Sequence, residues 1–330
     1  MSKTYKLNYY DETGKRRGKT FTARTLRLAR EKGEEWERLH LAGRSSSATV
    51  AKDILKYINE REPVLSPSTV RSYKGVQALI EESEIGKILT PRLTLSDVQK
   101  WVNSMVVEEL SPKTVKDRYC LLKSATEGSV LLDWKSVILP QQKKYIGHTP
   151  TDEEISNLLK YTQGQSDPTL YRAILLSAFG LLRRSEVCAI TSDDINGNQI
   201  TINKALVRND DGEWVVKSTK TVESTRVITY PESVIDALKG VEGRIVDCNP
   251  DALARRFERA LKFAKLPKFR FHDLRHYGAS VMHSLGVPDV YIMQRGGWST
   301  DHVMKRIYIN ALSDESKRQT DKVNEHFASL

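Results

Sequence analysis

The chain has 330 residues, enough for two or three domains, and 39% of them are hydrophobic, so a core of ordinary size can be buried. The 52 Lys and Arg residues outnumber the 42 Asp and Glu residues, which gives a net charge of +10. Such an excess favours an anionic partner, most often nucleic acid, although many basic proteins have no such partner. No apolar run approaches 18 residues, so we expect no membrane partner.

Cysteine usage and the first residues indicate the compartment. Cys120, Cys188 and Cys248 lie far apart and form no CxxC pair, so neither a zinc ribbon nor a disulfide framework is indicated. The N-terminus lacks the apolar core of a signal peptide. We therefore expect a cytoplasmic protein.

Residues 1–44 are predicted to form a small basic unit. In order, the pattern predicts a strand at 5–10, a Gly-containing turn, a strand at 19–22 and a polar helix at 23–40. This stretch holds twelve Lys or Arg against six Asp or Glu, an asymmetry typical of arms that bind nucleic acid. The turn carries Lys15, Arg16 and Arg17, which can reach a groove or phosphates; the alternative is a turn that only aids solubility.

Residues 49–128 follow a polar linker at 43–48 and have a helical pattern. Val50, Ile54 and Ile58 recur at the spacing of one helix face. Further helix starts are predicted at Ser66-Pro67, at Leu95 and at Ser111-Pro112. The pattern predicts a bundle of four or five helices. The last helix begins with the cations Lys113, Lys116 and Arg118, which can bind phosphate together with backbone N–H groups.

A second linker, at 129–148, leads into a region that mixes long helices with one sheet. Thr151 and the acidic residues after it start a helix. The predicted strands lie at 199–203, 214–217 and 226–230, with turns at 210–212 and 221–224.

Four segments of this last region carry side chains suited to chemistry. They are 180–187, with Arg183, Ser185 and Glu186; Lys220, just before a turn; 271–279, with His272 and Arg275; and 296–308, with Trp298 and Tyr308. Each short motif is weak alone, since a His-x-x-Arg box occurs by chance in many proteins. Their fixed order over about 125 residues is a much stronger signal.

The ordered set resembles the tyrosine recombinase (phage integrase) family, of the type found in phages and conjugative transposons. The resemblance implies a multidomain fold that is mainly α with small β-sheets. A sheet-plus-helix domain at 1–44 would bind arm sites in DNA, and a helical bundle at 49–140 would bind the core site. Residues 149–330 would form the α+β catalytic domain.

The chemistry of strand exchange accounts for the two arginines. Attack on a phosphodiester concentrates negative charge on the non-bridging oxygens, and guanidinium groups match those oxygens with paired N–H donors. Arg183 and Arg275, from different elements, are the candidates. Arg184 is next to Arg183, but neighbours on a helix point about 100° apart, so only one can face the site. The family pattern favours Arg183 and leaves Arg184 for the surface or the DNA backbone.

The nucleophile implied by the resemblance is Tyr308, which would form a 3′-phosphotyrosine. Tyr230 and Tyr291 compete with it, and only its position after the other motifs favours Tyr308. Storing the bond energy in this ester needs no nucleotide, and we expect neither a cofactor nor a metal. The rival, a metal nuclease, would need clustered carboxylates, but Asp193-Asp194 and Asp210-Asp211 have the pattern of turns.

Proton transfer is assigned to the remaining residues by the same resemblance. Lys220 would protonate the leaving 5′ oxygen, with Lys217 as its rival, and His272 would assist or bind the phosphate. Trp298 stands where the family has His or Trp, and its indole N–H can donate a hydrogen bond but cannot carry a proton. Tyr308 lies ten positions after Trp298, where a step of nine is common in the family, so His302 is a weak alternative at that slot.

The resemblance also implies the partners. They are double-stranded DNA with core and arm sites, a homotetramer on that DNA, an excisionase and a DNA-bending host protein, all in a bacterial cytosol or nucleoid. Val323, Phe327 and Leu330 form an apolar stripe that would pack within the chain or dock on a neighbouring protomer.

The function implied is integration and excision of a mobile element by cutting and rejoining DNA strands. A type IB topoisomerase would share the chemistry, and a non-catalytic DNA-binding regulator would share the fold. The basic N-terminal unit argues against the first alternative, and the complete set of motif residues argues against the second.

Overall fold

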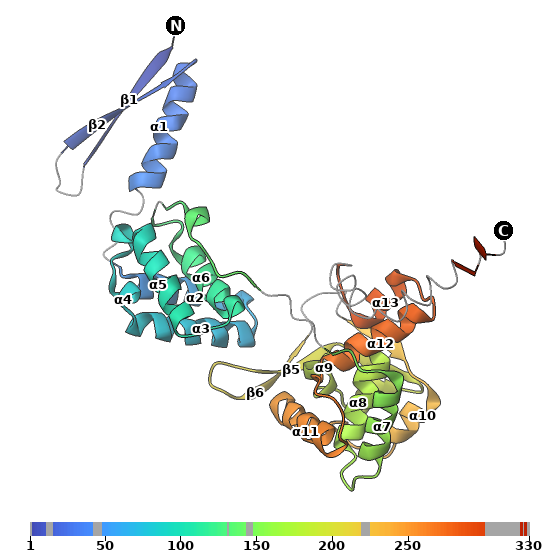
Figure 1. Cartoon of the computed structure of the whole chain (residues 1–330). Helices are drawn as coiled ribbons and strands as arrows, with labels where there is room; N and C mark the ends of the chain where they lie inside the picture. Colours follow the sequence, from blue (N-terminus) through green and yellow to red (C-terminus); the bar gives the residue numbers. More distant parts are fainter. Residues whose placement is uncertain are drawn as a thin grey trace. The chain divides into compact units, whose positions relative to one another are not determined.

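The computed structural model describes residues 2–10, 16–41, 48–130, 132–142, 148–218, 225–300 and residues 324, 325, 327 and 328. The chain divides into two compact units, residues 1–144 and 145–330. Figure 1 shows their elements. In the described part, no helix combines the length and apolar character needed to cross a bilayer. The finer division of the first unit, into 1–44 and 49–140, stays a prediction.

The N-terminal residues form a hairpin covered by a helix. Strands β1 (Lys3–Tyr10) and β2 (Arg16–Ala23) pair antiparallel, with Lys3 opposite Ala23, and α1 (Leu26–Leu41) packs on the hairpin. The Trp36 ring lies 4.9 Å from the ring of Tyr9 and 5.9 Å from that of Phe21. The predicted order of strand, strand and helix is confirmed, because one apolar face of a hairpin needs a helix to bury it.

The helical part contains five helices between residues 48 and 130, all of which the structure describes. They are α2 (Val50–Arg61), α3 (Pro67–Glu82), α4 (Glu84–Lys87), α5 (Leu95–Val107) and α6 (Pro112–Thr126), with 3₁₀ turns at η1 (Glu62–Val64) and η2 (Thr90–Arg92). Ser66 and Ser111 cap α3 and α6 as predicted, each accepting a backbone N–H three residues on. Val50, Ile54 and Ile58 are fully buried, so the predicted apolar face of α2 is confirmed.

The predicted linker at 129–148 is wrong in its first part. Residues 134–136 form a 3₁₀ turn, η3 (Trp134–Ser136), and the Tyr119 hydroxyl donates to the Trp134 carbonyl. Trp134 and Val137 are buried in the core of the helical bundle. Enough apolar side chains follow α6 to make packing more favourable than solvation for this segment.

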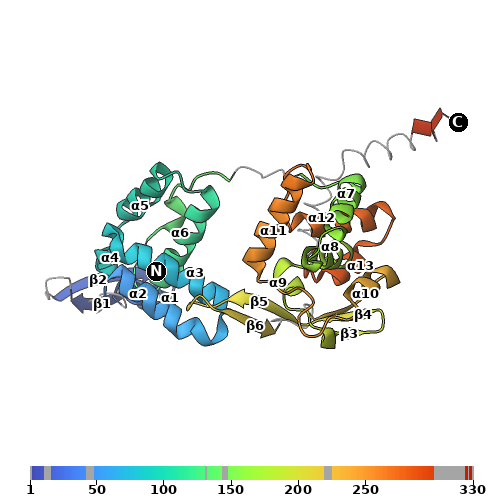
Figure 2. The same cartoon turned by 90° about the horizontal axis from the view of Figure 1, so that it is seen from below.

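The second unit is built around α8 (Thr169–Gly180), most of whose residues are buried. The other helices within residues 148–300 are α7 (Asp152–Gln163), α9 (Arg184–Val187), α10 (Glu232–Leu238), α11 (Pro250–Phe263), α12 (Asp273–Ser284) and α13 (Asp289–Gly296), with a 3₁₀ turn at η4 (Ser192–Asp194). Figure 2 shows α7, α11, α12 and α10 around α8. A side chain at Gly278 would overlap the Ala178 carbonyl, so glycine allows α12 to lie directly against α8.

The expectation of one sheet in this unit is wrong. Strands β3 (Ile195–Asn196), β4 (Gln199–Ile202) and β7 (Arg226–Thr229) form one antiparallel sheet, and β5 (Lys204–Arg208) and β6 (Trp214–Ser218) form another. The chain leaves the first sheet at Asn203, directly after β4, and the next five residues pair with β6. Alternation marks a strand but does not say which strand it pairs with.

Candidate active site

The first motif lies at the corner between α8 and α9. Leu181 follows α8 in the left-handed conformation, with φ 55° and ψ 37°, although it is fully buried. A leucine in this region is strained, and such strain persists only where the surroundings impose it. Its carbonyl accepts a hydrogen bond from Nη1 of Arg275. The strained turn therefore brings the first motif into contact with the third.

Arg183 precedes α9 in an extended conformation, with φ −73° and ψ 149°. The expectation that it lies on a helix is therefore wrong. Its neighbour Arg184 points elsewhere, with Nη2 3.7 Å from a carboxylate oxygen of Asp251 at the start of α11. Of the two arginines, Arg183 is the one that contacts the other motifs.

Glu186 holds Arg183 in place. Its side chain is 3% exposed. Oε1 accepts from Nη1 of Arg183 at 2.7 Å, and Oε2 accepts from the Arg183 backbone N–H at 2.9 Å. Arg183 also donates from Nη2 to the Gly297 carbonyl at 2.9 Å, yet its side chain stays 36% exposed. Arg183 is therefore fixed on one side and open on the other.

Arg275 is fully buried on α12 and lies against Trp298, with Cζ 3.9 Å from the centre of the indole ring. Its Nε and Nη2 find no acceptor among the described residues and are closed to solvent. Burial, and then the charge of Arg183, lower the pKa of Arg275 well below its ordinary value. A buried guanidinium with two unmatched donor atoms is costly, so an anionic ligand would relieve it. The ligand reaches these atoms only if the residues covering them move.

Trp298 follows a two-glycine turn at the end of α13. Gly297 has φ +63°, and a Cβ at Gly296 would strike the Trp298 ring, so both positions require glycine. Since Arg183 bonds the Gly297 carbonyl and Trp298 stacks on Arg275, this turn connects the two arginines.

His272 is exposed and immediately precedes α12, and its ring lies perpendicular to that of His276, with 4.8 Å between the ring centres. The pKa of His272 is lowered to about 4, mainly because the crowded site removes hydration, and further by His276 and Arg275. The pKa of His276 is lowered to about 4, mainly by burial. At neutral pH His272 is therefore uncharged and able to accept a proton.

Several predicted residues lie outside the described residues. They are Lys15, Lys220, His302, Tyr308, Val323 and Leu330. Phe327 is described and is 65% exposed. Lys217 is half-buried on β6.

The two competing tyrosines differ from each other. Tyr230 is buried, and its hydroxyl donates to the Leu176 carbonyl at 3.0 Å, while burial raises its pKa. It is therefore a core residue and a poor nucleophile. Tyr291 is 59% exposed on α13.

The carboxylates proposed for a rival metal site do not gather. Asp194 caps η4 and forms an ion pair with Lys204 at 2.8 Å, and Asp210 and Asp211 lie at the turn after β5. Within the described ranges, no group of three His, Cys, Asp or Glu side chains is arranged to hold a metal ion.

The predicted DNA-binding cations lie on the first unit. Arg16 and Arg17 are exposed at the start of β2. Lys113 and Lys116 are exposed on α6, but Lys113 forms an ion pair with Asp117 at 2.6 Å. Arg118 is half-buried.

Sequence reasoning missed Arg226, the first residue of β7. It is 7% exposed and donates from Nη2 to Oε2 of Glu186 at 2.8 Å. A signal was present: alternation along β7 puts position 226 on the same face as the buried Ile228. A cation on the core face of a strand needs a buried partner.

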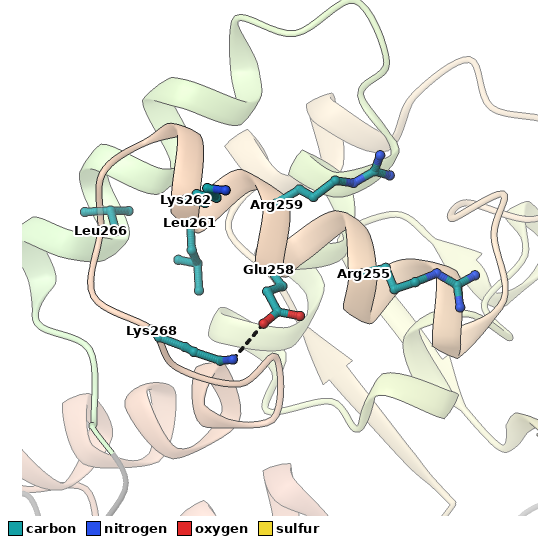
Figure 3. Close-up of a pocket in the computed structure, with 7 residues that line it drawn as sticks. All are labelled: Arg255, Glu258, Arg259, Leu261, Lys262, Leu266 and Lys268. Carbon is teal, nitrogen blue, oxygen red and sulfur yellow. Dashed lines mark ion pairs between the residues drawn. The ribbon is translucent and has the colours of Figure 1, made fainter.

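Sequence reasoning also missed a cationic surface on α11. A cavity of about 700 Å³ is lined there by Arg255, Glu258, Arg259, Leu261, Lys262, Leu266 and Lys268. Figure 3 shows these side chains and the ion pair of Lys268 with Glu258, 2.7 Å long. The spacing 255, 259 and 262 is that of one helix face, which was the available signal.

Comparisons with known proteins agree with this arrangement. The sequence profile of the phage integrase family matches residues 149–315. Over 166 residues the chain is 32% identical to a putative prophage phiRv2 integrase of Mycobacterium tuberculosis, an alignment that covers 44% of each protein. The chain thus matches less than half the length of that relative.

Solved structures share the fold. The Tn1549 transposon integrase in complex with a circular intermediate DNA superposes with a TM-score of 0.69 at 21% identity, covering 84% of this chain and 100% of that one. A lambda integrase dimer bound to a core site gives a TM-score of 0.60 at 17% identity, covering 91% of each chain. The expected fold class, multidomain and mainly α with small sheets, is confirmed.

Proposed function

The chain belongs to the phage integrase family, the tyrosine recombinases, and on this premise we propose that it is a site-specific DNA recombinase acting through Tyr308. It cuts a strand, holds the 3′ end as a phosphotyrosine and rejoins it to a new 5′ end. Its task is the integration and excision of a mobile element.

The observation that supports this function best is the pairing of Arg183 with Arg275. The two side chains come from different elements, Arg183 is open on one side, and Arg275 has two donor atoms without an acceptor among the described residues. Together they suit the oxygens of a phosphate that gains charge in the transition state. Because Arg275 is closed to solvent, DNA binding has to shift Trp298 or its neighbours before the phosphate is gripped.

The proposed proton transfers use the neutral state of His272 and the place of Lys220 in the family pattern. The Tyr308 oxygen bonds to phosphorus as the bond to the 5′ oxygen breaks. His272, neutral at pH 7, takes the phenol proton, and Lys220 gives a proton to the leaving oxygen. Trp298 donates a hydrogen bond to a phosphate oxygen. The reverse steps reseal the strand, so the ester conserves the bond energy and no nucleotide is consumed.

DNA is held by cations on both units. Arg16 and Arg17 on the hairpin bind arm sites, Lys113, Lys116 and Arg118 bind the core site, and the α11 surface adds phosphate contacts in the second unit. Affinity falls steeply with salt, because each phosphate contact releases a counterion. The active assembly is a homotetramer, with an excisionase and a DNA-bending protein setting direction.

Covalent capture tests this function. The probe is a pool of nicked duplexes with a randomised core, in which the short strand diffuses away after cleavage and leaves the protein attached. We expect adducts with the wild type and none with Tyr308→Phe. Tyr291→Phe, which alters an exposed tyrosine of the same unit, is the matched control and should react normally.

Three outcomes would contradict the proposal in different ways. No wild-type adduct indicates a DNA-binding regulator. An adduct that still forms with Tyr308→Phe shows that another residue is the nucleophile. Captured duplexes without any shared sequence indicate a topoisomerase.

A further inference from the structure

Arg226 has no role in the steps above, yet it is among the most buried charged residues of the second unit, with a side chain 4% exposed. Nη2 and Nη1 donate to Oε2 and Oε1 of Glu186 at 2.8 and 3.4 Å, and Nε donates to the Arg295 carbonyl at 2.8 Å. One guanidinium thus links β7, α9 and the last turn of α13.

The carboxylate that Arg226 holds is the one that holds Arg183. Glu186 accepts from the Arg183 backbone N–H and from its Nη1, on the same two oxygens that Arg226 contacts. Burial acts to raise the pKa of Glu186, but the hydrogen bond and charge of Arg226, followed by the charge of Arg183, bring it below its ordinary value. Without Arg226, Arg183 would be the one cation among the described residues that is hydrogen-bonded to this desolvated carboxylate.

Arg226 also lies against the turn that carries Trp298. A Cβ on Gly297 would come within 3.1 Å of Nη1, so the guanidinium packs directly on that residue. Gly297 accepts from Arg183, and Trp298 stacks on Arg275. Among the described residues, the contacts of Arg226 with Glu186 and Gly297 therefore lead to Arg183 and, through Trp298, to Arg275.

We propose that Arg226 is a positioning residue for strand cleavage, which fixes Glu186 and, through Glu186 and Arg183, the Gly297 turn, so that Arg183 and Arg275 converge on one phosphate. The kinetic part of this inference rests on the proposed recombinase function. Arg226 does not touch the phosphate and acts through Glu186. A shift of about 1 Å in a catalytic group costs about 100-fold in rate, which sets the scale of the effect.

The first test uses a duplex with the core sequence recovered by covalent capture. It compares the rate of single-turnover cleavage of this duplex with the dissociation constant for binding it. Arg226→Gln should cleave about 100-fold more slowly while its dissociation constant stays unchanged. Arg226→Lys, which keeps the charge but not the forked geometry, should fall between Arg226→Gln and the wild type.

The matched control is Arg172→Gln. Arg172 is a half-buried arginine of α8 that donates to the Ala237 carbonyl at 2.9 Å, and it forms no hydrogen bond or ion pair with a motif residue in the described part. The Arg172→Gln variant should cleave DNA at the wild-type rate. Equal rate losses in the two glutamine variants, or weaker DNA binding by Arg226→Gln, would overturn the inference.

The second test needs no DNA. The groups that face Glu186 are Arg183, Arg226, Arg275 and the phenol of Tyr230. Removing Arg226 should raise the folded-state pKa of Glu186 above that of the unfolded chain. The stability deficit of Arg226→Gln should then grow as the pH rises from about 5 to 7, since the buried carboxylate must ionise.

The double variant separates the two proposals. In a Glu186→Gln background, adding Arg226→Gln should bring no pH-dependent deficit and no further loss of cleavage. A pH-dependent stability deficit that persists in the Glu186→Gln background, or cleavage-rate losses of the two substitutions that multiply, would refute the role of Arg226 through Glu186. Neither result would contradict the recombinase function. Absence of any wild-type adduct would instead refute the recombinase function, while the unfolding data still decide whether Arg226 acts on Glu186.

Discussion

The helical part of the first unit and the second unit treat buried charge in opposite ways. In residues 48–130 and 132–142, the buried polar side chains are Ser66, Gln77, Thr90 and Thr126, and none of them is charged. In the described part of the second unit, Glu186, Arg226, Asp273 and Arg275 are all buried.

Under the proposed function, this difference separates a part built for stability from a part built for reaction. Caps and an apolar core stabilise the helices of the first unit, and its cations stay at the surface, where they retain their hydration. Buried charges add little net stability, because desolvation offsets the attraction between them. If Arg183 and Arg275 bind the phosphate as proposed, the buried charges around them mark the place where the fold gives up stability for chemistry.

The largest expected effect comes from removing the buried cation of that site. Arg275→Met should lower the rate of covalent capture by at least ~1,000-fold, because the substitution removes a preorganised cation that is proposed to bind the phosphate. Its free energy of unfolding should be unchanged or higher, since the guanidinium has two donor atoms unmatched among the described residues. Thermal unfolding and adduct formation measure the two effects. A large drop in melting temperature would mean that Arg275 is needed for the fold.

An intermediate effect is expected from the core of the helical part. Ile58 is fully buried, and Ile58→Ala should cost about 2–5 kcal/mol of unfolding free energy. Cleavage by the folded variant, measured at low temperature and saturating protein, should match the wild type. Slower cleavage under those conditions would show that the helical core of the first unit contributes to the chemistry as well as to stability.

The smallest effect concerns pH. The lowered pKa values of His272 and His276, about 4 against an ordinary 6.5, keep both rings neutral in the folded chain while the unfolded chain takes up protons. This stability is complete above pH 6.5 and is lost as the pH falls toward 4. Residues 48–142 contain no histidine, so the shift should affect the second unit and leave the helical part of the first unit unchanged.

His276→Gln tests this assignment. The melting temperature of the second unit should depend less on pH between 6.5 and 5 than in the wild type. An unchanged pH dependence would assign the effect to other groups.

Local signals were sufficient for the helical part. Ser66 and Ser111 predicted two helix starts, and the spacing of Val50, Ile54 and Ile58 predicted a buried face, because caps and periodicity act within a few residues. The same reasoning failed for Trp134, since a segment without periodicity gives no sign that it packs on distant helices.

The candidate site was only partly predictable. Arg183 and Arg275 could be named from their motifs, but their surroundings could not. Arg226 lies 40 residues from Glu186 in sequence, and their contact depends on how β7 and α9 pack. The two donor atoms of Arg275 that lack an acceptor among the described residues likewise depend on how the core buries this side chain.

The sequence by itself determined the family, through the order of its motifs. It also named Arg183 and Arg275 as candidate phosphate ligands, because a phosphate requires fixed cations wherever they lie in the chain. Only the tertiary structure decided that Arg183 precedes a helix instead of lying on one, that two small sheets replace one, and that Arg226 and Glu186 meet. Desolvation and hydrogen bonding between distant segments produce these features, and neither can be evaluated until the core has formed.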